Sequence, residues 1–170
     1  MIKSATTVVG KEIIIFTLPM TNFIIRFLNI LVAAILAGVS LGIWIGFNPT
    51  GLSVTTFVEQ QQNMLGALRV GMVSLVFAAT VITLLSAIAQ KNNRPVFVAL
   101  LLAATLFIAC ILITRFGNKP IEDIMMTWTV ASVPSNWTSF RDQWWTFHTM
   151  RTGTELIALV IITWTGIKKD

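Results

Sequence analysis

Residues 96–114 read VFVALLLAATLFIACILIT, a run of apolar side chains that no charge interrupts. A helix needs about 20 consecutive, mostly apolar residues to cross the hydrocarbon core of a bilayer. Residues 27–47 form a second stretch of this kind, also without a charge. Lipid offers no partners for free backbone amides, so segments that cross it must be helical. The two stretches therefore predict an all-α integral membrane protein.

The composition of the chain agrees with this prediction. Of the 170 residues, 55% are hydrophobic and 11% are charged, whereas soluble domains carry about 25% charged residues. The net charge of +5 comes mostly from basic residues at the ends of apolar runs, which indicates membrane topology rather than a nucleic-acid partner. The single cysteine, Cys110, excludes a disulfide, a CxxC redox pair and a thiolate metal cage.

Two further stretches complete a predicted four-helix bundle. Residues 64–89 are apolar except for Arg69, and residues 152–167 form a shorter apolar run that is expected to extend backward as a helix through His148 and Trp145. The sequence thus predicts one four-span membrane domain over residues 27–170, with spans at about 27–47, 64–89, 96–114 and 148–167.

The N-terminal segment, residues 1–26, is expected to lie in the cytoplasm or at the membrane interface. Its residues 13–25 are apolar but contain Pro19, so they fit either an interfacial helix or an early extension of the first span. Basic residues precede the first span, occur in the turn between spans two and three, and end the chain, whereas residues 48–63 have none. This distribution predicts that both termini are cytoplasmic, in a cell (inner) membrane.

Four of the six tryptophans occur in the predicted connection between spans three and four, residues 115–151. They are Trp128, Trp137, Trp144 and Trp145. An interfacial aromatic belt explains each of them singly. Their clustering on one side favours an aromatic-rich extracytoplasmic loop that covers the mouth of the bundle.

Polar residues gather where the fourth span begins. Helical neighbours lie three and four residues apart, so Trp144, His148, Arg151 and Glu155 share one face. Ionisable groups at membrane depth normally face the bundle interior or a wet cavity. Pairing of Arg151 with Glu155 explains both residues structurally, but it leaves His148, the only histidine, without an explanation.

The start of the second span provides the expected facing partner. Gln62, Asn63 and Arg69 follow Glu59 there. An inward-pointing Arg69 needs a carboxylate, for which Glu59 and Glu155 are the candidates. Alternatively, Arg69 extends its stem to the membrane surface.

The sequence indicates no resident cofactor. One histidine excludes a haem with two histidine ligands, while a haem with a single ligand and a bound quinone stay open. No metal-ligand spacing or phosphate-binding loop is present. Asn136 begins a glycosylation sequon, which has meaning only in a eukaryotic lumen.

Two elements of the chain resemble the anthrone oxygenase-like family of small four-helix membrane proteins. One is the element from Asn118 to Asp123 (NKPIED), which resembles the family's Asn-x-Pro-x-Asn, with Glu122 at the position of the second asparagine. The other is the tryptophan before His148-Thr149-Met150-Arg151, which resembles the family's Trp…His-x-x-Arg element. The resemblance implies oxidation of anthrones by molecular oxygen without an obvious cofactor.

The residues are compatible with this chemistry. His148 and Arg151 are the candidate catalytic residues: His148 as a base, since the imidazole pKa is ordinarily about 6.5, and Arg151 as the cation that stabilises a phenolate. The candidate substrate-binding residues are Arg69, Trp144, Trp145, Asn118, Gln62, Asn63 and Glu155. The first hypothesis is thus a membrane protein that binds a flat lipophilic molecule and oxidises an anthrone- or quinol-like compound.

Two alternatives stay open. One is a non-enzymatic membrane subunit, in which His148, Arg151 and Glu155 hold helices together or contact a partner chain. The other is a small transporter, for which a protonatable Glu155 is the main argument and oligomerisation the usual requirement. The expected partners are the bilayer, a hydrophobic small molecule and either a second copy or a partner subunit.

Overall fold

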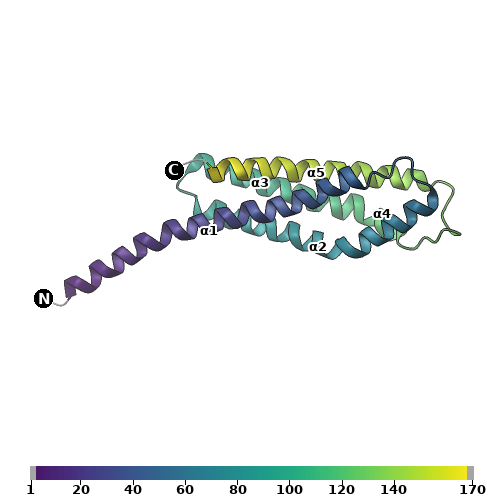
Figure 1. The fold of residues 1–170 in the computed structure, drawn as a ribbon. Helices are drawn as coiled ribbons and strands as arrows, with labels where there is room; N and C mark the ends of the chain where they lie inside the picture. The colour runs from purple at the N-terminus through teal and green to yellow at the C-terminus, as the bar shows by residue number, and fades with distance from the viewer. Residues whose placement is uncertain (1–2, 168–170) are drawn as a thin grey trace.

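The computed structural model describes the backbone of residues 3–167 and the side chains of residue 20 and residues 22–167. Within this part of the chain all regular secondary structure is helical (Figure 1). The elements are α1 (Lys3–Gly46), α2 (Val54–Ala89), α3 (Arg94–Ile113), a π-helical turn η1 (Thr114–Asn118), α4 (Lys119–Met125) and α5 (Trp137–Ile167). The all-α prediction is confirmed.

The four long helices run alternately up and down and form a bundle (Figure 1). Helix α1 packs against α2 and α5, and α3 packs against the same two helices from the opposite side. The short helix α4 continues the line of α3 at the end of the bundle where α5 begins. This end of the bundle therefore contains segments of α2, α3, α4 and α5 side by side.

Local sequence signals fix where the helices begin. Ser53 precedes α2 and its hydroxyl accepts a hydrogen bond from the Thr56 amide at 3.3 Å, which is the usual role of an N-cap serine. Pro95 lies in the first turn of α3, where the absence of an amide hydrogen costs nothing. Gly51, with a φ of 85°, occupies the left-handed region in the turn before α2, a conformation that glycine adopts without steric cost.

The buried core divides into two clusters along the bundle. Small side chains such as Ala33, Ala79, Ala103 and Ala158 are fully buried in the first and let the helices approach closely. The second cluster lies nearer to α4 and contains larger rings, among them Phe57 and the tryptophans Trp128 and Trp144. The bundle thus changes along its length from small-residue contacts to aromatic packing.

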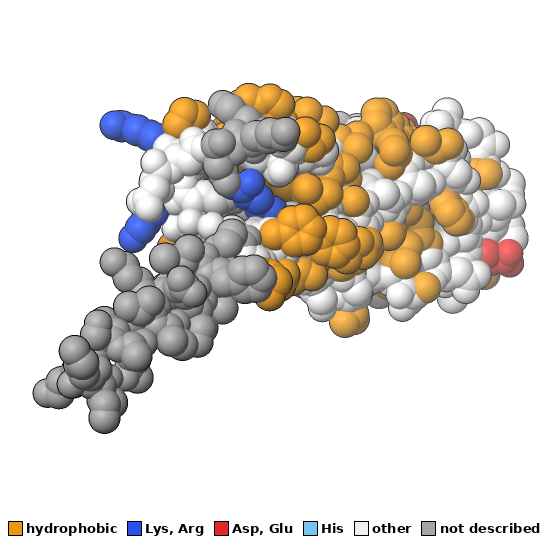
Figure 2. All heavy atoms as spheres, turned by 60° about the vertical axis from the view of Figure 1, so that its left-hand side comes forward, with side chains coloured by type: hydrophobic (Ala, Val, Ile, Leu, Met, Phe, Trp, Pro, Cys, Tyr) orange, Lys and Arg blue, Asp and Glu red, His pale blue; other side chains and the backbone are white. Residues whose placement is uncertain are grey.

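The outer surface is apolar over much of its length. Figure 2 shows apolar side chains over the middle of one face and Lys and Arg side chains at one end. Exposed large side chains include Phe77 and Ile88 on α2, Leu102 on α3 and Val160 on α5. Among the described residues, three helical segments are long and apolar enough to cross a membrane, namely Asn22–Gly46, Val54–Ala89 and Arg94–Met125. The chain is accordingly a helical membrane protein.

The helices are longer than the predicted spans. α2 begins at Val54 rather than near residue 64, and α5 begins at Trp137 rather than near residue 148. The predicted connection 115–151 is therefore mostly helical, and only residues 126–136 lie between α4 and α5. A span estimate counts apolar residues, whereas a helix continues past the membrane surface as long as its backbone hydrogen bonds are made.

From Lys3 onward, the backbone of the N-terminal segment is helical and continuous with the first span. α1 is one continuous helix through residues 13–25 and Pro19, so at the level of the backbone this stretch extends the first span. Lys168 and Lys169, which contributed to the predicted orientation, lie outside the described residues.

Candidate functional site

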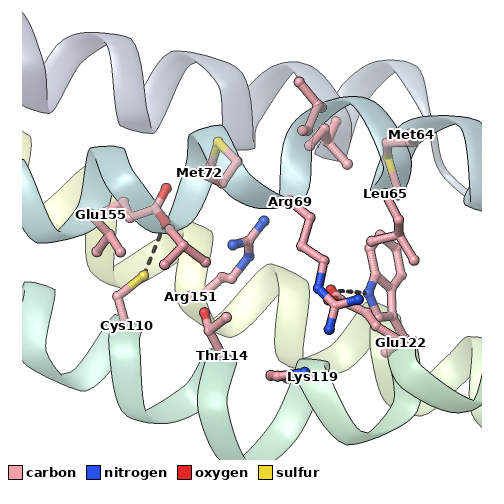
Figure 3. Close-up of a pocket in the computed structure, with 15 residues that line it drawn as sticks. Met64, Leu65, Arg69, Met72, Cys110, Thr114, Lys119, Glu122, Arg151 and Glu155 are labelled. Carbon is pink, nitrogen blue, oxygen red and sulfur yellow. Dashed lines mark hydrogen bonds between the residues drawn. The ribbon is translucent and has the colours of Figure 1, made fainter.

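A small cavity lies inside the bundle near α4 (Figure 3). Its volume is about 70 Å³. Helix α2 supplies an apolar wall that includes Met64, Met72 and Val76, whereas α3, α4 and α5 supply most of the polar groups. The complete lining consists of Ile43, Met64, Leu65, Leu68, Arg69, Met72, Val73, Val76, Cys110, Thr114, Lys119, Glu122, Trp144, Arg151 and Glu155.

Four of the predicted site residues line this cavity together: Arg69, Trp144, Arg151 and Glu155. Figure 3 shows Arg151 between Glu155 and Arg69, so the two guanidinium groups and the carboxyl group converge from α2 and α5. The cavity therefore combines two cations, a buried acid and an indole ring. This set can hold a molecule with a flat apolar body and an anionic oxygen.

The carboxylate partner of Arg69 differs from both candidates expected from the sequence. Arg69 pairs with Asp123 of α4, and Lys119 donates to the other oxygen of Asp123 at 2.7 Å. The expected pairing of Arg69 with Glu59 or Glu155 is thus wrong, because Asp123 lies directly opposite Arg69 across the α2–α4 contact. The three side chains are a third to a half exposed, so the pairs border the cavity rather than fill it.

The carboxyl group of Glu155 is buried at the opposite end of the cavity. Its Oε1 accepts a hydrogen bond from the Cys110 thiol at 3.0 Å, and the Ser40 hydroxyl also interacts with the carboxyl group. Arg151 forms no ion pair with Glu155 in the described part of the chain, although the two are four residues apart. Instead, Arg151 Nε donates to His148 Nδ1 at 3.3 Å.

The π-helical turn η1 aligns the polar residues that come from α3 and α4. Four residues turn an α-helix by about 400°, so positions spaced by four drift about 40° around the axis at each step. A π turn holds an additional residue and cancels part of this drift. Cys110, Thr114 and Glu122 consequently all line the cavity, although they lie four and eight residues apart.

Helix α5 approaches this turn closely. A Cβ atom added at Gly117 of η1 would lie 2.6 Å from the ring of Phe147 on α5. Contacts that short do not occur between carbon atoms, so a larger residue at Gly117 would push the two elements apart. The backbone of Gly117 is not left-handed, so glycine is required here by packing and not by backbone conformation.

Trp144 joins the two elements that resemble the anthrone oxygenase-like family. Its indole Nε1 donates to Glu122 Oε1 at 3.1 Å, and its backbone carbonyl accepts from Asn118 Nδ2 at 3.1 Å. Asn118 is buried and lies beside the cavity without lining it. Glu122, at the position of the family's second asparagine, thus accepts the hydrogen bond from the Trp144 indole.

His148 lies behind the cavity rather than in its wall. The side chain is fully buried, and its ring stacks on Trp144 and on Trp145 with centroid distances of 5.2 and 5.6 Å. The contact with Arg151 connects it to the cavity indirectly. Its predicted role as a base stays a prediction.

Gln62 and Asn63 lie apart from the cavity lining. Gln62 Nε2 donates to the carbonyl oxygens of Trp128 at 2.7 Å and Met125 at 3.3 Å, which ties α2 to the end of α4. Asn63 is exposed. The structure thus places Gln62 where it supports the segment over the mouth of the bundle.

Five polar residues at the site are not among the sequence-based candidates: Cys110, Thr114, Lys119, Glu122 and Asp123. A signal for Cys110 and Glu122 was present, since Cys110, Thr114, Asn118 and Glu122 are spaced by four along one apolar helix. Sequence periodicity does not reveal this alignment, because positions spaced by four drift apart around the axis of a regular α-helix. Only the π turn brings them back to one side. Among the described residues, no three potential metal ligands from His, Cys, Asp and Glu lie together.

The comparisons with known proteins bear on these elements directly. A family model described as anthrone oxygenase matches residues 60–161, which include both family-like elements and nearly all of the cavity lining. Neither the comparison with curated proteins nor that with solved structures gave a significant match. Because the family model covers more than half of the chain, this protein belongs to the anthrone oxygenase family.

Proposed function

We propose that the chain binds a flat phenolic molecule of the anthrone or quinol class and oxidises it with molecular oxygen. One observation supports this most strongly: Arg69, Arg151 and Glu155 line one cavity, although two helices supply them. Two cations next to a buried acid suit a reaction that removes a proton and leaves an anionic oxygen.

The first step of the proposed reaction is proton removal. A base takes a proton from the methylene carbon of an anthrone, and the electron pair delocalises into the ring system onto its oxygen. The guanidinium groups of Arg69 and Arg151 stabilise the resulting phenolate-type anion. Trp144 provides a flat apolar surface on which the ring lies.

The second step consumes molecular oxygen. The carbanion adds to one atom of O₂, and the peroxide anion that forms takes up a proton. Loss of water from this hydroperoxide converts the carbon into a carbonyl group. One atom of O₂ thus ends in the quinone and the other in water, together with both hydrogens of the methylene group. The proposed reaction uses no oxidant other than O₂ and no cofactor.

Two residues compete for the role of base. Glu155 lines the cavity, so its carboxyl group can reach a bound molecule. His148 is the residue predicted from the sequence, but its Nδ1 already accepts a bond from Arg151 and its ring is covered by two indoles. We therefore assign proton removal to Glu155 and the positioning of Arg151 to His148.

The size of the cavity requires the bundle to open. A dry cavity of about 150 Å³ holds one benzene ring, and the cavity here measures about 70 Å³. A fused ring system thus fits only if α2 moves away from α4, where Arg69 and Asp123 form the bridge. We propose that the ligand arrives from the bilayer through this contact.

The charged residues suggest how the cavity lies in the membrane. At about 1.5 Å per residue, the stretch from Arg94 to Arg115 spans about 31 Å, close to the hydrocarbon thickness of about 30 Å. We propose that α5 crosses the same layer, that the protein resides in the cell (inner) membrane, and that both termini are cytoplasmic. The cavity then begins at the outer membrane surface, next to Arg69 and Arg151.

An oxygen-consumption assay on the purified protein in lipid nanodiscs tests the proposal. With an anthrone substrate and heavy-isotope O₂, we expect one labelled atom in the quinone and a strong loss of turnover in Glu155→Gln. Glu59→Gln, which alters an exposed carboxyl group of α2, is the matched control and should retain turnover.

The same assay separates the alternatives. Loss of turnover in His148→Asn with full turnover in Glu155→Gln would return the role of base to His148. Ligand binding without oxygen uptake would support a binding subunit, and neither binding nor uptake for any anthrone or quinol would refute the proposal.

A further inference from the structure

An open groove of about 510 Å³ lies at the end of the bundle opposite to α4. It is formed where α1 passes the turn that joins α2 to α3 (Figure 1). The groove shares no residue with the cavity of the candidate site. Its lining consists of Asn22, Arg26, Ala89, Gln90, Asn92, Asn93, Arg94 and Pro95.

The groove combines cationic and neutral polar side chains. Arg26 comes from α1 and Arg94 from α3, two helices that pack on α2 and α5 from opposite sides. Among the described residues that line the groove, none is an aspartate or a glutamate. Guanidinium groups bind phosphate oxygens with paired hydrogen bonds, and asparagine amides add further donors. The lining thus suits a phosphate group.

The position of Arg94 is unfavourable for the helix to which it belongs. Arg94 is the first residue of α3, where a cation opposes the helix dipole, and the side chain of Asn93 does not cap this end. Arg94 is exposed, and it forms no ion pair in the described part of the chain. A bound anion would compensate both the guanidinium charge and the positive end of the dipole.

The groove lies at the depth of the lipid headgroups. Two segments that can cross the membrane meet there, since one ends at Ala89 and the next begins at Arg94. Lys and Arg side chains gather at this end of the molecule (Figure 2). Lipid headgroups lie directly outside the hydrocarbon layer, so the bilayer itself can supply a phosphate to the groove.

Exposed apolar side chains continue from the groove along α2 and α3. Leu85 lies one turn from Ala89 and is 53% exposed, and Val98 lies one turn from Arg94 and is 56% exposed. Leu101 follows on the same side of α3. Because α2 and α3 pack side by side, they offer a continuous apolar surface next to the groove. Acyl chains can use this surface, whereas a free phosphate ion cannot.

We propose that the groove binds the headgroup of an anionic phospholipid. The phosphate diester lies between the guanidinium groups of Arg26 and Arg94, and the acyl chains run along α2 and α3. Basic pockets between membrane helices are known to bind anionic headgroups in this way. The groove has no acidic side chain for the choline or ethanolamine cation of a zwitterionic lipid among its described residues, which favours an anionic one.

The bound lipid has a structural consequence. It joins α1 to the turn between α2 and α3, and a ligand that binds only the folded state raises the stability of that state by mass action. The site does not depend on the proposed oxygenase function, because it lies at the other end of the bundle.

Native mass spectrometry of the full chain tests the site. The protein is released from nanodiscs that contain phosphatidylglycerol and phosphatidylcholine in equal amounts, and we expect it to retain phosphatidylglycerol in preference. Arg94→Gln should lower the retained phosphatidylglycerol several-fold. Lys91→Gln is the matched control, because it removes the same charge from the same turn and Lys91 does not line the groove. Its retention should equal that of the unaltered chain.

Equal losses in Arg94→Gln and Lys91→Gln would show that surface charge alone attracts the lipid, and they would overturn the proposal. So would the absence of a preference for phosphatidylglycerol in the unaltered chain. Arg26→Gln provides a second variant in case Arg94→Gln does not fold, and it should lower retention in the same way.

Thermal unfolding distinguishes a lipid from a soluble phosphate compound. Phosphatidylglycerol in the nanodisc should raise the unfolding temperature of the unaltered chain relative to pure phosphatidylcholine, and this rise should shrink in Arg94→Gln. Glycerol phosphate, added to protein in phosphatidylcholine nanodiscs, should cause no rise. An equal rise with glycerol phosphate would identify a site for soluble phosphates and refute the lipid assignment. Neither measurement involves oxygen uptake, so this proposal and the proposed function can fail separately.

Discussion

The indole nitrogen of Trp144 donates a hydrogen bond to the Glu122 carboxyl group at 3.1 Å, across the contact between α5 and α4. Both side chains are buried, and both line the cavity. The bond thus fixes the indole face on which a flat ligand is proposed to lie. It also joins the two sequence elements that are typical of the family.

Removal of the acceptor from this bond should destabilise the bundle. In Glu122→Ala the indole N–H is left buried without a partner, which costs about 1–3 kcal/mol. Glu122→Gln retains a carbonyl acceptor and should lose less than half as much. Thermal unfolding in detergent, followed by tryptophan fluorescence, measures both. Equal losses in the two variants would show that the bond contributes little.

Gly117 should tolerate no side chain. In Gly117→Ala the added methyl group meets the Phe147 ring at 2.6 Å, so α5 must shift, and overpacking of this kind costs about 1–3 kcal/mol. Gly153→Ala on α5 is the matched control, because its added carbon has nothing within 4 Å. Alanine is the better helix former by about 1 kcal/mol, so Gly153→Ala should be neutral or stabilising in the same unfolding assay. Phe147→Ala should rescue Gly117→Ala.

Asp123→Asn should change ligand access more than stability. Asp123 and its two basic partners are a third to a half exposed, and such pairs contribute about 0–1 kcal/mol. Without the carboxylate, Arg69 no longer bridges α2 and α4, so ligand association should become faster. Stopped-flow quenching of tryptophan fluorescence by an anthrone measures the rate. Asp142→Asn, which removes an ion pair with Arg141 away from the cavity, should leave the rate unchanged.

Gln62 should matter for the segment between α4 and α5. Gln62→Leu removes both bonds to the carbonyl oxygens of Met125 and Trp128, and we expect residues 126–136 to be cleaved several-fold faster by an added protease. Asn63→Ala alters the exposed neighbour and should have no effect. Equal cleavage rates for the two variants would contradict a supporting role for Gln62.

The sequence predicts the fold well because hydrophobic length is a one-dimensional signal. Uninterrupted apolar runs such as 96–114 identify helices that need no tertiary information. It also predicts that Arg69, Trp144, Arg151 and Glu155 belong together, since ionisable residues at membrane depth must face inward. The predicted starts of α2 and α5 lie about ten residues too late in the sequence, because each helix begins with polar residues such as Gln62 outside the apolar layer.

The partners within the site could not be read from the sequence. Which carboxylate meets Arg69 depends on the rotation of α4, and that rotation is set by the π turn. Periodicity assumes a constant number of residues per turn, so it loses the register at such a point. The orientations of His148 and Gln62 could not be predicted either. The sequence identifies both as polar residues near the spans, but helix packing decides whether their side chains reach the cavity.

The extra residue in the turn at Thr114–Asn118 implies an asymmetry in how this chain can change over evolution. Many substitutions in that stretch would preserve the register, but deletion of a single residue would restore regular α-helical winding. Everything after the deletion would then rotate by about 100°, carrying Asn118 and Glu122 away from Trp144. Family members are therefore expected to vary at exposed positions such as Arg115 and Phe116, to retain Gly117 and Asn118, and to keep the distance from cysteine to proline constant.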